Sequence, residues 1–182
     1  MAPPFARNSD EAHLYMQLHP CVCGSADVDV SSSVAETPAG WMVRYAGACV
    51  DCGRERTFEF RQPEELSMPP ENAWAAGDEP SELLDAGEWL WVADSYGSVP
   101  AEPSEELSEV RRRHLRTDLM AALAAVDEVL KFLPDDAAEV PDEAFWSERG
   151  RRMRVAEPGR FQRFRLAAAR QTYQRAVDDL AP

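Results

Sequence analysis

The four cysteines form two close pairs, and this placement constrains the chain more than any other feature. Cys21 and Cys23 are separated by one residue, Cys49 and Cys52 are separated by two, and a glycine follows each pair. Closely spaced thiols of this kind are typical of structural zinc sites, in which four ligands surround the ion as a tetrahedron. We therefore predict one zinc site with the ligands Cys21, Cys23, Cys49 and Cys52.

Other interpretations of these cysteines stay open at the level of sequence. His19 lies two residues before Cys21 and could replace one cysteine as a ligand. A redox-active pair is less favoured, because a thioredoxin-like Cys-x-x-Cys opens a helix, whereas Cys52 leads through Gly53 into a strand pattern. A catalytic zinc would keep an open coordination position beside an acid or base. Metal-free thiols are the remaining alternative.

The residues around the cysteines alternate between polar and apolar, which is typical of half-buried strands. The alternation covers three segments, at about 27–34, 41–46 and 57–61, and a Thr-Pro-Ala-Gly turn separates the first two. The pattern predicts a small three-stranded antiparallel sheet. Its inner face is expected to carry Val28, Val30, Trp41, Val43, Tyr45, Phe58 and Phe60.

The segment of about residues 19–61 resembles a zinc ribbon. The second cysteine pair, Cys-Val-Asp-Cys-Gly, matches the ribbon's Cys-x-x-Cys-Gly, whereas the first pair has one residue fewer between its cysteines. The opening Cys-Val-Cys-Gly-Ser is also similar to the start of the SEC-C motif, but the further Cys-Cys or Cys-His pair of that motif is missing. The resemblance implies a zinc-stabilised sheet and says nothing about the remainder of the chain.

Helical patterns flank the sheet. Asn8 to Glu11 has the composition of a helix start, and Pro20 ends that helix. Ser104 is expected to cap a long amphipathic helix that Pro134 stops, and a final helix follows the Pro158-Gly159 break. We predict an α+β protein, a three-stranded zinc-ribbon-like sheet followed by a helical hairpin region. Its expected parts are 1–62, an acidic Pro-rich connector with a short helix at 63–103, and the helical hairpin at 104–182.

Composition narrows the class of protein. The formal net charge is -14 over 182 residues, and Lys131 is the only lysine. The bias toward Ala, Arg, Glu and Pro is typical of a GC-rich bacterial genome. Neither a signal-peptide run nor a membrane-spanning run of apolar residues is visible. These features predict a soluble cytoplasmic protein, in which cysteines are more often metal ligands than disulfides.

Charge is unevenly distributed, and this suggests two kinds of partner. Residues 61–110 contain 13 acids and one arginine, whereas residues 149–175 contain nine arginines and one acid. The acidic strip could engage a basic protein partner, while the arginines could bind nucleic acid or pair with the acids of the same molecule. The candidate protein-contact residues are Trp89, Trp91, Glu88 and Asp94, and the candidate nucleic-acid residues are Arg160, Arg163 and Arg165.

The sequence contains no recognisable catalytic motif: GxSxG, GxGxxG, the P-loop and HExxH are all missing. We therefore expect a protein that is not an enzyme. The favoured hypothesis is a zinc-stabilised interaction protein, such as an adaptor, a regulatory subunit or an immunity-type inhibitor of a basic partner. The alternative is a nucleic-acid-associated zinc-ribbon factor. Neither the partner nor the oligomeric state follows from the sequence.

Overall fold

The computed structural model describes residues 3–38, 40–63, 77–97 and 107–181. It has the expected α+β composition, with a three-stranded antiparallel sheet followed by helices. The chain divides into two compact units, one formed by Met1–Ala76 with Ser81–Leu83 and the other by Gly77–Pro80 with Leu84–Pro182. Much of the expected Pro-rich connector, 64–76 and 98–103, lies outside the described residues.

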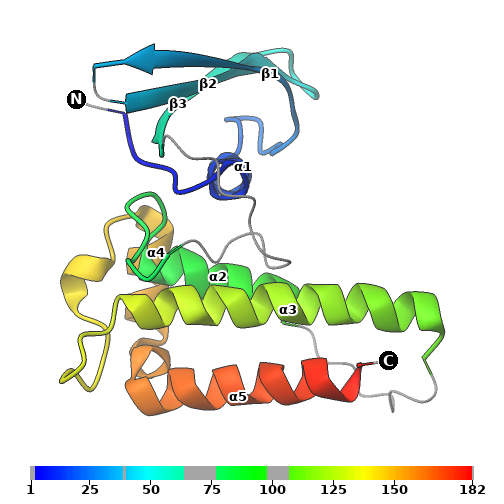
Figure 1. Ribbon diagram of the computed structural model, residues 1–182, viewed down its shortest axis with the longest axis vertical. Coiled ribbons are helices and arrows are strands. Elements are labelled where there is room, and N and C mark those ends of the chain that lie inside the picture. The colour runs from blue at the N-terminus through cyan, green and yellow to red at the C-terminus, as the bar shows by residue number, and fades with distance from the viewer. Residues whose placement is uncertain (1–2, 39, 64–76, 98–106, 182) are drawn as a thin grey trace. The chain divides into compact units, whose positions relative to one another are not determined.

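The first unit is an antiparallel sheet with one helix (Figure 1). The strand order is β1-β2-β3, and Tyr45 at the centre of the sheet lies opposite Ser32 on one side and Phe58 on the other. The sheet confirms the strands expected from the two-residue alternation. The elements are α1 (Ser9–Leu18), β1 (Val28–Thr37), β2 (Gly40–Cys49) and β3 (Glu55–Gln62).

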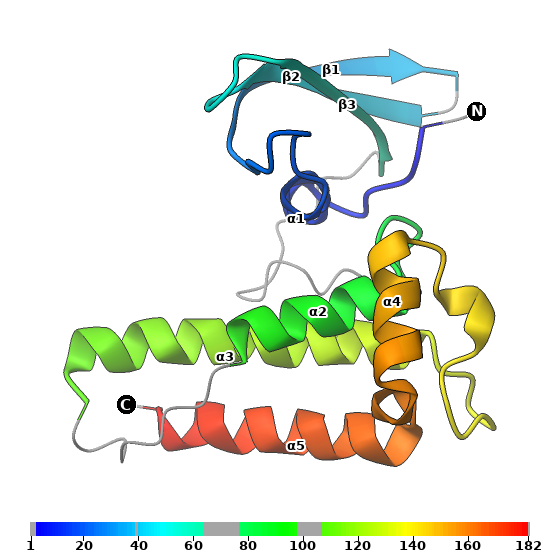
Figure 2. The ribbon, with the colours of Figure 1, turned by 180° about the vertical axis from the view of Figure 1, so that it is seen from behind.

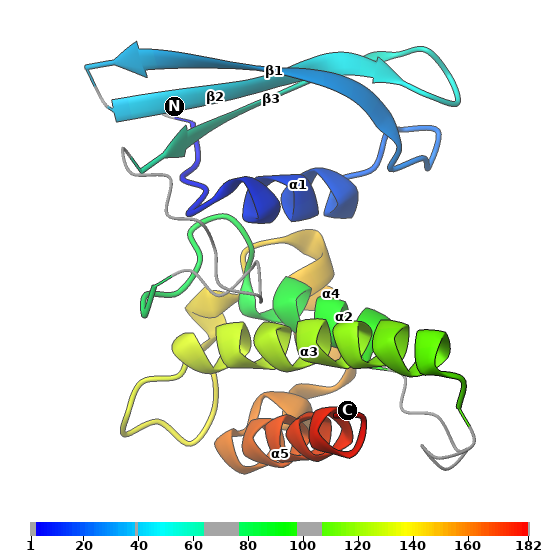
Figure 3. The ribbon, with the colours of Figure 1, turned by 45° about the vertical axis from the view of Figure 1, so that its right-hand side comes forward.

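α1 lies across one face of this sheet and forms the core with it (Figure 3). Met16 of α1 packs in one cluster with the buried side chains of Val43, Tyr45 and Phe60. Trp41, which was expected in this core, is 36% exposed. A ten-residue helix is about 15 Å long, whereas a ten-residue strand spans about 33 Å, so α1 covers only part of the sheet face.

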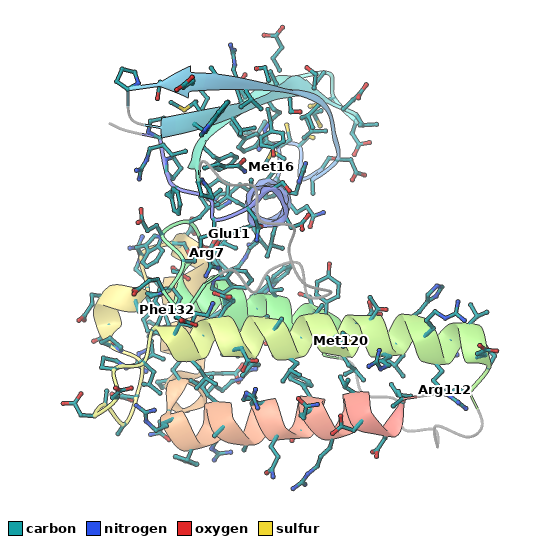
Figure 4. All side chains as sticks on the ribbon, viewed as in Figure 1. Arg7, Glu11, Met16, Arg112, Met120 and Phe132 are labelled. Atoms are coloured by element: carbon teal, nitrogen blue, oxygen red, sulfur yellow. The ribbon has the colours of Figure 1, made fainter. Side chains whose placement is uncertain are left out.

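A buried ion pair anchors the start of α1. Glu11 is completely buried, and its carboxylate accepts the Arg7 backbone N–H at 2.7 Å and the Arg7 guanidinium at 2.8 Å (Figure 4). Asn8 is the N-cap, as the sequence pattern predicted, because its side-chain oxygen accepts the Glu11 N–H at 2.8 Å. A buried charge needs such a partner and several hydrogen bonds, and Glu11 has both.

The second unit is helical. α3 and α5 run antiparallel side by side, as expected for a hairpin, and α2 packs along another side of α3 (Figure 1). Ser104, the expected cap of the long helix, lies outside the described residues, and Ser108 caps α3 instead. None of the described helices is long and apolar enough to cross a membrane. The helices are α2 (Ala86–Tyr96), α3 (Glu109–Lys131), α4 (Glu148–Ala156) and α5 (Arg163–Asp179), with short 3-10 turns at Asp142–Ala144 and Pro158–Phe161.

α2 and α4 lie against each other (Figure 2), and Asp85 forms hydrogen bonds at the N-terminal ends of both helices. One carboxylate oxygen accepts the Glu88 N–H at 2.9 Å, and the other accepts the Ser147 N–H at 2.6 Å. The Glu88 side chain accepts the Asp85 N–H in return, which completes a capping box. A Cβ added to Gly87 would lie 2.4 Å from the Gly150 Cα. The N-terminal ends of α2 and α4 therefore approach so closely at Gly87 and Gly150 that a larger residue at either position would clash.

We expect Gly150→Ala to lower the free energy of unfolding by about 1–3 kcal/mol, as overpacking of a tight contact does. The added Cβ would lie 2.2 Å from both carboxylate oxygens of Asp85 and would disturb both helix ends. Urea denaturation followed by circular dichroism measures the loss. Gly159→Ala is the matched control, because a Cβ there meets nothing within 4 Å. Equal stability of the Gly150→Ala variant and the unchanged protein would contradict the expected clash.

Glu88 also makes stability depend on pH. Burial, with the nearby charge of Asp85, raises the pKa of Glu88 from 4.5 to about 7, although Arg149 lowers it in part. The folded state therefore binds this proton more tightly than the unfolded chain does. The stabilisation is complete below the unfolded pKa and is lost as pH rises through the folded pKa.

We expect Glu88→Gln, which stays neutral, to gain stability relative to the unchanged protein as pH rises from about 5 to about 8. The gain should be on the order of 1 kcal/mol or more, since each unit of pKa shift corresponds to about 1.4 kcal/mol. Denaturation curves at several pH values measure the difference between the two proteins. Glu143→Gln, at an exposed position, is the control and should follow the unchanged protein. A stability difference that does not vary with pH would refute this role of Glu88.

Candidate metal centre

The sheet and the turns at one of its ends bring the four cysteines together. Cys21 and Cys23 lie in the connection between α1 and β1, Cys49 is the last residue of β2, and Cys52 lies in the turn before β3. Val28 at the start of β1 is opposite Cys49. This register places the turn that carries Cys21 and Cys23 beside the turn that follows Cys49. The two cysteine pairs, which are distant in sequence, therefore become neighbours.

Each cysteine pair is held in a tight turn that contains a glycine. The Gly24 N–H donates to the Cys21 carbonyl at 2.7 Å, and the Gly53 N–H donates to the Cys49 carbonyl at 2.8 Å. Both glycines have positive φ, +94° and +71°, a conformation that costs other residues energy. The glycine after each pair therefore lets the chain turn back so that both sulfur atoms of the pair point to the same side.

The four sulfur atoms form one compact cluster. They all lie within 4.8 Å of one another, and the separations of Cys21 from Cys52 and of Cys23 from Cys49 are each 3.6 Å. A zinc–sulfur bond of about 2.3 Å in a tetrahedron gives sulfur–sulfur distances of about 3.8 Å. These two separations of 3.6 Å are far longer than a disulfide bond and are close to the spacing of a metal-bound tetrahedron.

Burial and charge favour a cation at the centre of the cluster. Cys21 and Cys49 are buried, whereas Cys23 and Cys52 are exposed. The backbone N–H groups of Cys52 and Asp51 help to lower the pKa of the Cys49 thiol to about 6. The Arg54 N–H acts in the same direction on Cys52, but the three neighbouring cysteines outweigh it and raise the pKa of that thiol to about 12. The four sulfurs cannot all ionise without a compensating positive charge.

His19 is engaged elsewhere. Its Nδ1 lies 2.9 Å from the Tyr15 carbonyl oxygen, and its ring stacks on the Tyr15 ring with centroids 3.9 Å apart. Among the residues that the structure describes, the metal-binding cluster contains the four cysteines and not His19. The geometry therefore favours the four-cysteine ligand set over the histidine alternative.

The clustered cysteines and the antiparallel sheet are consistent with a zinc-ribbon-like module. Comparison with protein-family models, curated proteins and solved structures found no match for this chain.

The candidate protein-contact residues occupy different environments on α2. Trp89 and Glu88 are buried in the helical unit, where they contribute to its packing. Asp94 forms an ion pair with Arg160 at 2.6 Å. Trp91 is the one candidate that presents a large apolar surface, since it is 40% exposed. The guanidinium of Arg149 lies 4.6 Å from the centre of its ring.

The candidate nucleic-acid residues contact other parts of the helical unit. Arg160 binds the carboxylate of Asp94, as described above, and Arg163 donates to the backbone carbonyls of Pro134, Asp135 and Ala137. The guanidinium of Arg165 lies 5.4 Å from the centre of the Phe164 ring. Pairing of arginines with acids of the same molecule, one of the expected interpretations, therefore describes Arg160, whereas Arg163 binds backbone carbonyls.

The association of Arg149 with Trp91 could not be predicted from sequence. The sequence places Arg149 only at the start of an arginine-rich region, far along the chain from Trp91. The contact between α2 and α4 at Gly87 and Gly150 brings these two side chains together. By contrast, the capping box at the start of α2 has a readable signature, an Asp followed three residues later by a Glu.

We expect the purified protein to contain about one zinc ion per chain and Cys49→Ser to lose most of it, because one of four ligands is removed. The midpoint temperature of thermal unfolding of the first unit should also fall, because metal binding contributes directly to folding. Elemental analysis and thermal melting with and without a chelator measure both effects. Val50→Ser, at an exposed position in the same turn, should keep its zinc. A metal-free protein whose melting is unchanged by chelator would refute the site.

Proposed function

We propose that this protein is a non-catalytic, zinc-stabilised interaction protein that binds a protein partner through its helical unit. The observation that carries the first half of the proposal is the cluster of four sulfur atoms within 4.8 Å of one another. Zinc is the ion we assign, because a set of four cysteine thiolates at tetrahedral spacing is a typical structural zinc site. A reducing compartment such as the cytoplasm would keep these thiols free to bind it.

The ligand set supports a structural rather than a catalytic role for the ion. A catalytic zinc has three protein ligands and an open position for water or substrate, whereas four cysteines complete the tetrahedron. A three-stranded sheet with a single helix is also a small core, and such modules depend on a metal for stability. The ion would therefore link the turns at one end of the sheet, and its binding energy would contribute to folding.

Trp91 and Arg149 are the proposed centre of the partner-binding surface. Tryptophan and arginine are the residues that most often dominate binding energy at protein interfaces. Trp91 is 40% exposed, and the guanidinium stacked on it at 4.6 Å holds the ring in one orientation. A partner that covers this pair would meet a rigid aromatic surface, so little conformational entropy would be lost on binding.

Nucleic-acid binding is the weaker proposal. Arg160 and Arg163 are engaged by an acid and by backbone carbonyls, so binding to phosphates would require these contacts to break. The net charge of -14 also opposes the electrostatic attraction of a polyanion.

We expect Trp91→Ala to weaken partner binding by tenfold or more, about 1.4 kcal/mol or above, as the loss of an interface tryptophan does. The full-length tagged protein would be used to isolate its partner from the native host with and without nuclease, and affinity would then be measured with the purified partner. Trp146→Ala is the matched control, because Trp146 is equally exposed at 41% but packs against Phe132.

Three results would count against the proposal. Equal weakening by the two tryptophan substitutions would show that binding does not depend on the surface at Trp91. Loss of the captured material after nuclease treatment would favour the nucleic-acid alternative. Conversion of a small molecule by the purified protein would contradict the non-catalytic role. Neither of the first two results would affect the zinc assignment, which the metal analysis tests separately.

A further inference from the structure

The two outer edges of the sheet differ. The N-terminal segment pairs with the outer edge of β3, where the Ala6 N–H donates to the Arg61 carbonyl and the Arg61 N–H donates to the Pro4 carbonyl, both at 2.9 Å. Among the residues that the structure describes, no segment pairs with the outer edge of β1, which forms one border of the sheet (Figure 3). Every residue from Ser31 to Glu36 is exposed.

The central part of the open edge lacks the usual protection against strand pairing. Natural edge strands are blunted by lysine, proline, bulges or short length. β1 is ten residues long, and its central run Val30–Ala35 contains no charge and no proline. Val34 is 59% exposed, although it lies on the same side of the sheet as buried Val43, its partner in β2. The edge therefore has unpaired backbone groups together with exposed apolar surface.

We propose that a second copy of this chain pairs with β1 in antiparallel orientation, which joins the two sheets into one six-stranded sheet. The proposed two-fold axis passes between the two copies of Ser32. In this register Val30 of one copy lies opposite Val34 of the other on the core side of the sheet. On the opposite side Ser31 lies across from Ser33. Directly opposed side chains of these kinds stabilise antiparallel pairs.

The pairing of apolar side chains, together with charge, selects this register over its neighbours. A shift of one residue in either direction would turn the core side of one copy to the solvent side of the other, and in one direction it would also place Asp29 opposite Glu36. The shift to a Ser33 axis would place Val30 opposite Glu36 and Val34 opposite Ser32. Only with Ser32 on the axis does Val34 lie opposite Val30 and each acid of β1 opposite an uncharged residue.

Net charge determines the conditions in which the pairing is strongest. Each chain carries a net charge of -14, so two copies repel each other at low ionic strength. At about 1 M salt the Debye length is about 3 Å, and this repulsion is screened. Salt also strengthens apolar association when its anion is strongly hydrated, as sulfate is. High salt should therefore favour the dimer, whereas it weakens complexes that depend on attraction between opposite charges.

The test uses the full-length zinc-loaded protein in sedimentation equilibrium from micromolar to millimolar concentration, at low and high salt. We expect a monomer–dimer equilibrium that shifts toward dimer as salt increases. Hydrogen–deuterium exchange on the same samples should show concentration-dependent protection of the amides in 28–36 and none in α3. A protein that stays monomeric throughout, or a dimer whose β1 amides remain unprotected, would overturn the proposal.

Val34→Lys should raise the dissociation constant at least tenfold, because it places a charge opposite Val30 of the other copy. Val155→Lys, on α4, is the matched control, since Val155 is 82% exposed and lies outside the first unit. Circular dichroism and zinc content establish that both variants are folded, and the exchange experiment needs no variant at all. Loss of the dimer in both variants, or in neither, would contradict pairing through β1.

Discussion

The main constraint on the first unit is that four sulfur atoms lie close together, so that a positive charge is needed to compensate for their mutual repulsion when they ionise. The turns hold these atoms within 4.8 Å of one another, where they cannot all be ionised without a cation. One end of the sheet lies at this cluster, while α1 covers only part of the sheet face. A bound ion would therefore complete a core that a single helix leaves unfinished, and metal binding would then contribute directly to the folding of this unit.

In the helical unit the main constraint is the burial of acidic side chains. Asp85, Glu88 and Glu128 are all almost completely buried, and such groups are costly unless they are paired or hydrogen-bonded. Asp85 accepts backbone N–H groups at the starts of two helices, and Glu128 pairs at 2.6 Å with Lys131, the only lysine of the chain. Asp85 thereby connects two helices that are distant in sequence, whereas Glu128 pairs within α3. They are consequently part of the framework and not of a surface.

The same reasoning explains why the uneven charge does not translate directly into binding surfaces. Arg160 and Arg170 of the arginine-rich region each bind an aspartate of another helix at 2.6 Å. Such exposed pairs contribute little to stability, but they reduce the charge available to an external ligand. The proposed partner surface is accordingly an aromatic residue stacked with an arginine, whereas the proposed self-association surface is a strand edge whose central run is uncharged.

Local features of the fold followed from the sequence alone. The alternation of residues in 27–61 predicted the three strands, the pattern at Asn8 predicted the start of α1, and the cysteine spacing predicted which residues form the cluster. Each of these signals acts over a few residues, where backbone preference and side-chain periodicity suffice. The cap of α3 was misplaced, because several polar residues upstream could serve and only the structure selects Ser108.

Only the tertiary structure decided which side chains are accessible. Trp89 and Trp91 are two residues apart on α2, yet the first is buried by the neighbouring helices and the second is 40% exposed. The sequence cannot separate them, because both are large and apolar and the difference depends on which face of α2 meets α3 and α4. In the same way, strand alternation placed Trp41 on the core side, and the short length of α1 left it exposed. The candidate metal ligands could be identified from local cysteine spacing, whereas the surface available to a partner depends on packing between distant segments.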